Sequence, residues 1–408
     1  MALRIRLGCI IAAFVFASVY RGQTNNVPSD STVRRAKLSL PPLVDFQVPF
    51  PPTPVKADGK QLLVYELHIT NFSTDKLELT RVEVLKDRSL EALASFEGEE
   101  LEHQMTHVGF MDKAVIELLG LTLPPDQPRE RTINPGLRTV MFLMLTLEKE
   151  INLPKTLRHR LYFKPTLPDA KQADEAVEGA EINVTRKRPV VLGPPVRGGG
   201  WLAAGALSNT SYHRRSIFPL NGRARISQRF AIDWAQLGPG GRVYRGDDVS
   251  NTNAFAYGQE VLAVADAVVA QVKDGVPEND PTSNAESVSF TLDTALGNHV
   301  TLDLGKGRFA FYSHLQPNSL RVRLGQKVRR GQVLARLGNS GHSHGPHLHF
   351  HVADANSVDA EGIPFVFESF ELQGVLSSLH ETWKPSTTDK PETRRREIPT
   401  ENAIVLFP

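Results

Sequence analysis

The stretch Gly338-Asn339-Ser340-Gly341-His342-Ser343-His344-Gly345-Pro346-His347-Leu348-His349-Phe350-His351-Val352 begins as a glycine-rich loop and ends as a strand. From Pro346 onward polar and apolar residues alternate, and a strand directs alternate side chains to opposite faces. One face of the predicted strand is therefore apolar and requires a core. The other face carries three imidazoles, those of His347, His349 and His351.

The imidazole face has two interpretations. Histidines are tolerated on a solvated sheet face, and an isolated pair would be weak support for a functional site. Here a turn-rich loop that can arch over a cleft precedes the strand, and further acid–base residues lie upstream. Because imidazole is the commonest side-chain ligand of transition metals, the pattern favours a metal or catalytic site.

Length and composition limit the classes of protein to consider. The 408 residues suffice for two domains with sizeable cores. The formal net charge is only +2, so no global basic field indicates a nucleic-acid partner. The frequent glycines and prolines favour turns and short strands over long helices.

Residues 1–22 are predicted to be a signal peptide. Arg4 and Arg6 supply its positive region, and the apolar run 10–19 is too short for a comfortable membrane span. The single cysteine, Cys9, precedes most of this run, whereas a lipoprotein cysteine would follow it. Removal of the leader would leave a mature chain without cysteine, which excludes disulfides and thiolate ligands. Any metal must then be held by histidines and carboxylates.

A β-sandwich is predicted over residues 44–188, after a polar linker at 23–43. Runs such as 62–71, 77–85 and 137–145 alternate with a period of two between turn residues, which is typical of an immunoglobulin-like sandwich. No motif in this half indicates catalysis, and a likeness of fold alone assigns no binding role. Four histidines scattered among its charges are interpreted as solvated or structural: His68, His103, His107 and His159.

A second β domain is predicted over residues 206–372, between a Pro- and Gly-rich linker at 189–205 and a tail at 373–408. The apolar end of the tail either pairs with a sheet or clamps the domains. Gly-Gln precedes a strand at both 258–259 and 325–326, as in a compact half-barrel. Biotin- and lipoyl-type carrier domains share this pattern but need a lysine at the hairpin tip. The equivalent residue here is Asp266, so a carrier function is disfavoured.

Two residues extend the histidine strand into a constellation. Asp233 lies in an otherwise apolar strand, where a carboxylate is costly unless it is paired or binds a metal. His314 lies at the end of another predicted strand. Together with the His-x-His strand, they supply the donors of a catalytic zinc site that keeps one coordination position open.

On these residues the second domain resembles the lysostaphin-type (LytM) zinc metallopeptidases, murein endopeptidases with a duplicated hybrid motif that cut peptide cross-links in bacterial cell walls. The resemblance implies that the second domain is a lysostaphin-type sheet, a half-barrel like a barrel-sandwich hybrid. The sandwich and the tail lie outside the resemblance, and the sandwich predicted from periodicity makes the whole chain all-β. The matching pieces occur in family order over about residues 211–355: the strand ending in Asp233, 258–264, 297–300, 312–315, 328–341 and 345–350.

The resemblance also implies roles for individual residues. Asp233 and His349 would be zinc ligands, and zinc would activate a water and polarise the scissile carbonyl. His314 and His347 would orient that water and stabilise the oxyanion, one as general base and the other as hydrogen-bond donor. Three neighbouring histidines are expected not to be ligands. His351 would lie beyond the residues that bind the metal, and His342 and His344 would lie at the rim or contact the substrate.

The chain departs from the family pattern at one position. The family places its first zinc-binding histidine four residues before the aspartate, where this chain has Arg229. A guanidinium cannot bind zinc, because it stays protonated and offers no lone pair. Either a displaced donor fills the vacancy, or the site is degenerate.

His213, in Ser211-Tyr212-His213-Arg214-Arg215, is the nearest upstream histidine. Because a tetrahedral site with an open position needs three protein donors, the predicted ligand set is His213, Asp233 and His349. A surface histidine beside two arginines is the alternative interpretation of His213. Asp247 and Asp248 are weaker substitutes for the third ligand.

These features together predict a secreted or periplasmic zinc metalloendopeptidase that hydrolyses peptide bonds in peptidoglycan. Its partners would be peptidoglycan peptides and other cell-wall enzymes, without nucleic acid, and with membrane contact only through the leader. The alternative is a non-catalytic regulator of cell-wall hydrolases. Arg229 favours this alternative, whereas the intact His314, His347 and His349 favour the enzyme.

Overall fold

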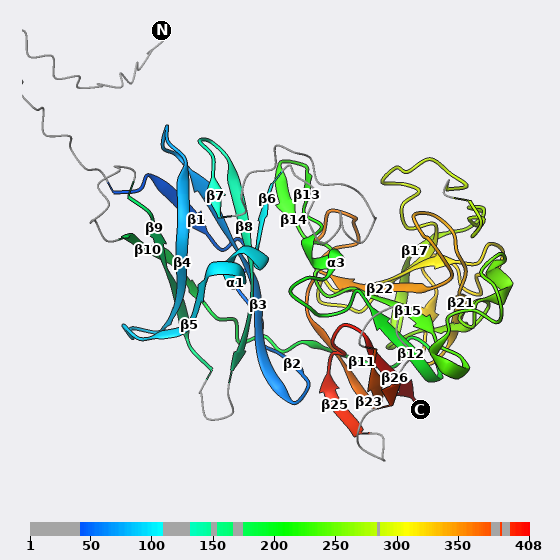
Figure 1. Cartoon of the computed structure of the whole chain (residues 1–408). Coiled ribbons are helices and arrows are strands. Elements are labelled where there is room, and N and C mark those ends of the chain that lie inside the picture. The colour runs from blue at the N-terminus through cyan, green and yellow to red at the C-terminus, as the bar shows by residue number, and fades with distance from the viewer. Residues whose placement is uncertain are drawn as a thin grey trace, which may run out of the picture. The chain divides into compact units, whose positions relative to one another are not determined.

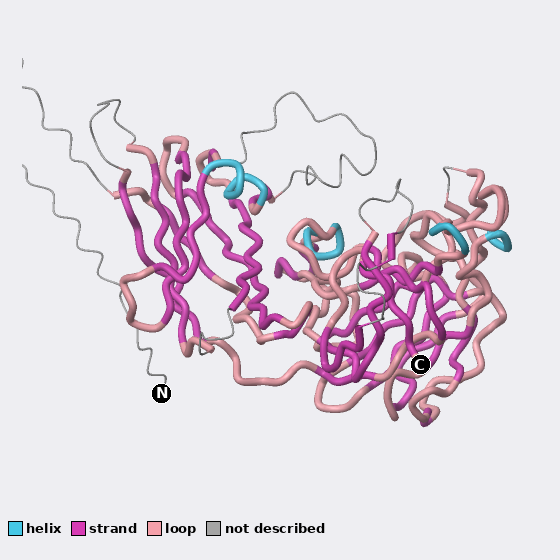
Figure 2. Tube along the Cα trace, turned by 60° about the horizontal axis from the view of Figure 1, so that its bottom comes forward, coloured by secondary structure: helices cyan, strands magenta, loops and turns pink. Residues whose placement is uncertain are grey.

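A computed structural model describes residues 41–108, 131–147, 153–165, 174–283, 286–376, 384–385 and 392–408. The predicted signal peptide and nearly all of the first linker lie outside these residues. Residues 41–408 form one compact unit, and strands dominate its regular structure (Figure 2). No helix among the described residues is long and apolar enough to cross a membrane.

Two five-stranded sheets form the N-terminal sandwich (Figure 1). The first has the order β1–β3–β8–β6, with β2 paired to β3, and the second has the order β10–β9–β4–β5, with β7 paired to β4. The bounds of the first sheet are β1 (Val44–Gln47), β2 (Val55–Ala57), β3 (Lys60–Asn71), β6 (Met105–His107) and β8 (Arg138–Leu147). Those of the second are β4 (Leu77–Lys86), β5 (Ala92–Glu97), β7 (Thr132–Ile133), β9 (Thr156–Phe163) and β10 (Glu175–Asn183).

Strand β3 is buried on both faces. Its odd-numbered residues, including Leu63 and Tyr65, pack in the sandwich core with β4, β8 and β9. Its even-numbered residues Leu62 and Val64 pack instead against the core of the second domain. Because side chains alternate along a strand, Glu66 also lies on this second face and is buried.

A 12-stranded sheet organises the second domain. Its path is β11–β23–β26–β12–β15–β22–β19–β18–β17–β20, with β24 and β25 also paired to β23. The bounds of the first six strands in chain order are β11 (Val190–Leu192), β12 (Gly198–Ala204), β15 (Ile232–Gln236), β17 (Ala267–Lys273), β18 (Asn298–Asp303) and β19 (Phe309–Leu315). The others are β20 (Lys327–Val328), β22 (Leu348–Ala353), β23 (Phe365–Val375), β24 (Lys384–Pro385), β25 (Glu392–Glu397) and β26 (Ala403–Phe407).

Smaller elements complete the described structure. Two further strand pairs are β13 (Phe218–Leu220) with β14 (Arg223–Arg225), and β16 (Glu260–Leu262) with β21 (Val333–Arg336). The helices are short: α1 (Gly98–His103), α3 (Tyr212–Arg215), η1 (Pro239–Gly241) and η2 (Asn251–Asn253). The predicted all-β class is confirmed.

The segments predicted as a linker and a tail both contribute strands, and the apolar end of the tail pairs with a sheet, one of the two roles expected of it. Residues 189–205 contain β11 and β12, which are strands of the large sheet, and β12 pairs with both β15 and β26. The tail contributes β25 and β26, both paired to β23. Glycine and proline content indicated a connector, but the segment also brings Val190, Leu192, Trp201 and Ala203 into the core of the second domain.

Strand β22 confirms the predicted alternation. Leu348, Phe350 and Val352 are fully buried in the core of the second domain. His349 and His351 lie on the opposite face, which is also buried. The neighbouring strand β15 pairs with β22 so that Asp233 lies directly opposite His349. This register brings the carboxylate and the imidazole together.

Candidate metal centre

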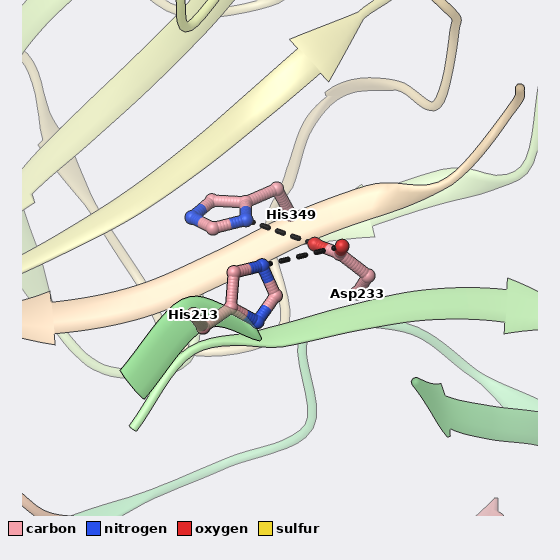
Figure 3. Close-up of side chains that lie close together, drawn as sticks. All are labelled: His213, Asp233 and His349. Carbon is pink, nitrogen blue, oxygen red and sulfur yellow. Dashed lines mark hydrogen bonds and ion pairs between the residues drawn. The ribbon is translucent and has the colours of Figure 1, made fainter. Parts of the chain in front are cut away.

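Three side chains converge from three different elements (Figure 3). Asp233 comes from β15, His349 from β22, and His213 from α3. His349 Nδ1 lies 2.8 Å from Asp233 Oδ1, and His213 Nε2 lies 3.3 Å from Asp233 Oδ2. Among the described residues, this is the one group of three or more His, Cys, Asp or Glu side chains arranged closely enough to hold a metal ion.

The donor set fits zinc. One potential ligand atom from each residue lies within 4.8 Å of the others. Bonds of about 2.0–2.1 Å to a tetrahedral zinc ion place ligand atoms roughly 3.3 Å apart, and the His349 and His213 nitrogens lie 2.8 and 3.3 Å from the Asp233 oxygens. Two imidazoles and one carboxylate also leave a fourth position open.

Hydrogen bonds on the far side of each imidazole orient the rings. His213 Nδ1 donates to the carbonyl oxygen of Gly205 at 2.9 Å, so Nε2 turns its lone pair toward Asp233. His349 Nε2 lies 3.0 Å from His351 Nδ1, which leaves His349 Nδ1 facing Asp233. Metal-binding histidines characteristically use their second nitrogen in this way. His351 thus contacts the nitrogen of His349 that does not face Asp233.

His314 and His347 lie beside the cluster, with their ring centroids 4.8 Å apart. His347 Nε2 lies 3.4 Å from Asp233 Oδ1. The Nδ1 atoms of the two rings bond to the backbone, His314 to Ser340 O and His347 to Gly345 O, both at 2.8 Å. These bonds orient both rings through Nδ1 and leave the Nε2 atom of each ring available for other contacts.

A bulge in β19 directs His314 into the site. Simple alternation would put His314 on the same face as Tyr312, which is buried in the core. The pairing of β18 with β19 shifts register by one residue here, and His314 has a φ of 62°. A bulge reorients the following side chain, and a non-glycine residue in this region carries strain of about 1–3 kcal/mol. Such strain is common at functional sites.

Opposing electrostatic effects separate the two histidines in the metal-free chain. Burial alone would raise the pKa of Asp233, but His213 and His347 hold that pKa well below its usual range. Burial acts to lower the pKa of His347, yet Asp233 outweighs it and raises that pKa. Burial, together with His347 and His349, holds the pKa of His314 well below normal. These surroundings favour the neutral form of His314 and shift His347 toward its protonated form.

Tyr212 is a site residue that the sequence did not single out. Its hydroxyl donates to Asp233 Oδ2, the oxygen that also faces His213. Burial, and then Asp233, raise the pKa of Tyr212 well above its usual range, so the phenol stays protonated. Gly205 has a φ of 57°, and a side chain there would collide with the Tyr212 ring. The adjacency of Tyr212 to His213 was the available signal.

Arg229 is fully engaged elsewhere. Its Nε and Nη2 donate to Glu66 Oε2 at 2.9 and 2.7 Å, and Nη1 donates to Gly362 O at 3.0 Å. Nη1 also pairs with Glu361. The arginine at the family's ligand position therefore serves a buried ion pair with the sandwich.

The remaining candidates lie outside the cluster. Asp247 and Asp248 are exposed, and Asp247 accepts a hydrogen bond from Asn253 at 2.9 Å. His342 and His344 are exposed on the loop before β22, and His342 pairs with Glu286. Among the sandwich histidines, His103 is exposed. The other three are buried: His68, His107 and His159.

Comparison with known proteins identifies a family that part of the chain matches. Residues 245–360 match peptidase family M23, which confirms the predicted resemblance over this segment. The matched segment includes His314, His347 and His349, whereas His213 and Asp233 precede it. A curated protein from Haemophilus influenzae, described as an uncharacterized metalloprotease, is 32% identical over 134 residues. The alignment spans 33% of this chain and 23% of that protein's length.

Two solved structures are among those to which the chain is similar. A variant of the catalytic domain of the prophage-encoded protein EnpA from Enterococcus faecalis is 20% identical, with a TM-score of 0.22, and the alignment covers 33% of this chain and 73% of that one. The catalytic domain of lysostaphin from Staphylococcus simulans is 16% identical, with a TM-score of 0.21, and the alignment covers 41% and 88%.

Proposed function

We propose that the protein is a zinc metalloendopeptidase that hydrolyses peptide cross-links in bacterial peptidoglycan. The observation that carries the proposal is the convergence of His213, Asp233 and His349 beside two oriented histidines. The M23 match and the metalloprotease relative support the peptidase class. The peptidoglycan substrate and a location outside the cytoplasm, secreted or periplasmic, are proposed on the lysostaphin-type resemblance.

The three donors would hold the ion through His213 Nε2, an Asp233 oxygen and His349 Nδ1. When bound, zinc supplies Lewis acidity toward water and toward a peptide carbonyl. Tyr212 and His351 keep Asp233 and His349 in position through the hydrogen bonds described above. These supporting contacts limit reorganisation when a substrate binds.

His314 and His347 divide the proton chemistry. The neutral His314 has the lone pair needed to take a proton from the attacking water as general base. The charged His347 can donate a hydrogen bond to the developing oxyanion. Their backbone bonds to Ser340 and Gly345 hold each ring in one orientation.

The regulator alternative loses its main support. It rested on Arg229 at the family's ligand position. That arginine now has a structural explanation in its contacts with Glu66 and Gly362, and His213 offers a replacement donor.

The decisive experiment is the zinc content of purified protein, with wild type measured beside His213→Ala. We expect one zinc per wild-type chain and a markedly weaker affinity in the variant. Wild type should also release cross-link fragments from purified peptidoglycan, detected by mass spectrometry as new amino termini. Folded wild type that binds no zinc after reconstitution, or that holds zinc without cleaving peptidoglycan, would contradict the proposal.

A further inference from the structure

The segment that carries His213 is too short to position itself. Helix α3 has four residues, and Ser211 at its N-terminus makes no side-chain capping bond. One turn of helix is unfavourable in isolation, because nucleation fixes several residues for a single hydrogen bond. The position of His213 therefore depends on its own bond to Gly205 and on the contacts that its neighbours make.

Helix α3 has two differently bound sides. Tyr212 and His213 contact Asp233 and Gly205 within the second domain. Arg214 points the other way, and its side chain is completely buried. Its Nη2 donates to the backbone carbonyls of Tyr65 at 2.9 Å and Leu143 at 2.8 Å, in strands β3 and β8 of the sandwich.

The carboxylate of Glu66, in the sandwich, is the counter-ion of the buried Arg214. Glu66 Oε1 accepts from Arg214 Nε at 3.1 Å, while Oε2 accepts from Arg229 at 2.7 Å. Burial lowers the pKa of Arg214, Glu66 opposes this shift, and the neighbouring charge of Arg229 lowers the pKa further. A buried arginine is tolerated only with a counter-ion and satisfied hydrogen bonds. Loss of the Glu66 charge would leave two adjacent buried cations with much less compensation.

We propose that Glu66 is a positioning residue for the metal centre: through Arg214 it holds α3 so that His213 completes the ligand set. The inference rests on the proposed metal site and adds that the sandwich takes part in building it. Glu66 does not touch the ion or the substrate. A ligand on a strand is held in place by its sheet. His213 lies on a one-turn helix instead, and the ion pair of Glu66 with Arg214 supplies the missing support.

The test uses Glu66→Gln in the full chain, because glutamine keeps the shape and removes the charge. Zinc affinity is measured by competition with a chromogenic chelator. We expect the zinc Kd to rise about 10- to 100-fold, the range typical of partners that orient a ligand. Glu83→Gln is the matched control. Glu83 accepts from Arg160 at 3.0 Å and Tyr162 at 3.1 Å within the sandwich, and its loss should leave the Kd unchanged.

A double-mutant cycle separates positioning from general weakening. If Glu66 acts through His213, Glu66→Gln should have almost no effect on zinc Kd in a His213→Ala background. The same fold-change in both backgrounds would overturn the inference, since the effect would then bypass His213. Near-ultraviolet circular dichroism of each metal-free variant at the assay temperature shows that the domains remain packed.

The outcomes distinguish the inference from the proposed function. Wild type without zinc would defeat the metal site itself. Wild type with zinc, and Glu66→Gln with equal affinity, would defeat only the positioning role. If the glutamine variant does not fold, Glu66→Asp takes its place in the cycle, because it keeps the charge but shortens the reach to Arg214. It should raise the Kd less, and an unchanged Kd would again overturn the inference.

Discussion

The two halves of the proposed metal centre differ in what holds them. Asp233 and His349 are opposite residues on paired strands, and their flanking residues Ile232, Trp234 and Phe350 are buried in the core. Neither donor can move without disrupting the sheet. His213 has no such support, and its one-turn helix depends on buried charges. Donors of the same chemical kind can thus be held by apolar packing or by an ion-pair network.

The difference has an energetic consequence. Packing is insensitive to charge, whereas a buried ion-pair network fails when one partner is removed. The strand half should therefore tolerate changes in the sandwich, and the helix half should not. The variants below test each half separately.

The largest effect is expected when the strand half is broken. His349→Ala removes a donor and the partner of Asp233, so zinc and hydrolysis should be lost together. We expect kcat/KM to fall at least roughly 10⁴-fold, about 5.4 kcal/mol of transition-state stabilisation. Zinc analysis and a peptide-release assay check this. His342→Ala is the control on the exposed loop, and full zinc and activity in His349→Ala would refute the assignment.

A smaller loss should follow when the ligands are kept and the proton chemistry is removed. His314→Gln and His347→Gln should retain one zinc per chain and lower kcat about 10²- to 10⁴-fold, the usual contribution of a positioned acid or base. Steady-state kinetics beside zinc analysis separates these variants from ligand loss. A variant that loses its zinc would instead make that histidine part of the ligand set.

Restoring the family residue should damage the helix half. Arg229→His removes a guanidinium that forms ion pairs with Glu66 and Glu361. Breaking a buried pair costs about 3–5 kcal/mol, so the urea midpoint of the metal-free chain should fall. The zinc content should not rise above one per chain. A variant of unchanged stability would show that Arg229 has no structural role.

The smallest effect concerns the sandwich alone. His159 is buried and bonded to Tyr65 and Ala180, and burial lowers its pKa to about 4. An unfolded histidine titrates near 6.5, so the unfolded state binds more protons between pH 6.5 and 4. The contribution of neutral His159 is therefore complete above pH 6.5 and is lost as pH falls through 4, by roughly 3.4 kcal/mol.

Urea unfolding of the metal-free chain between pH 4 and 8 measures this contribution. His159→Gln cannot take up the proton, so its stability should depend less steeply on pH than that of wild type. Parallel pH profiles for the two proteins would contradict the expected titration.

The sequence predicted the strand half far better than the helix half. A period of two was enough to separate the core and histidine faces of residues 347–352, and the family spacing identified Asp233. Nothing local predicted that Glu66 and Arg229, 163 residues apart, would pair. The bulge at His314 could not be predicted from the sequence either, because regular alternation would place that ring in the core. His213 was found only by counting donors.

Strand β26 has a consequence for how the protein is made. It follows every other described strand along the chain, yet it lies between β23 and β12 inside the large sheet. While the chain leaves the ribosome, the edges of β12 and β23 wait unpaired for residues 403–407. Such late, long-range pairing is slow and leaves exposed edges open to aggregation. A chain whose synthesis stops shortly before residue 403 would therefore keep these edges unpaired and would bind chaperones.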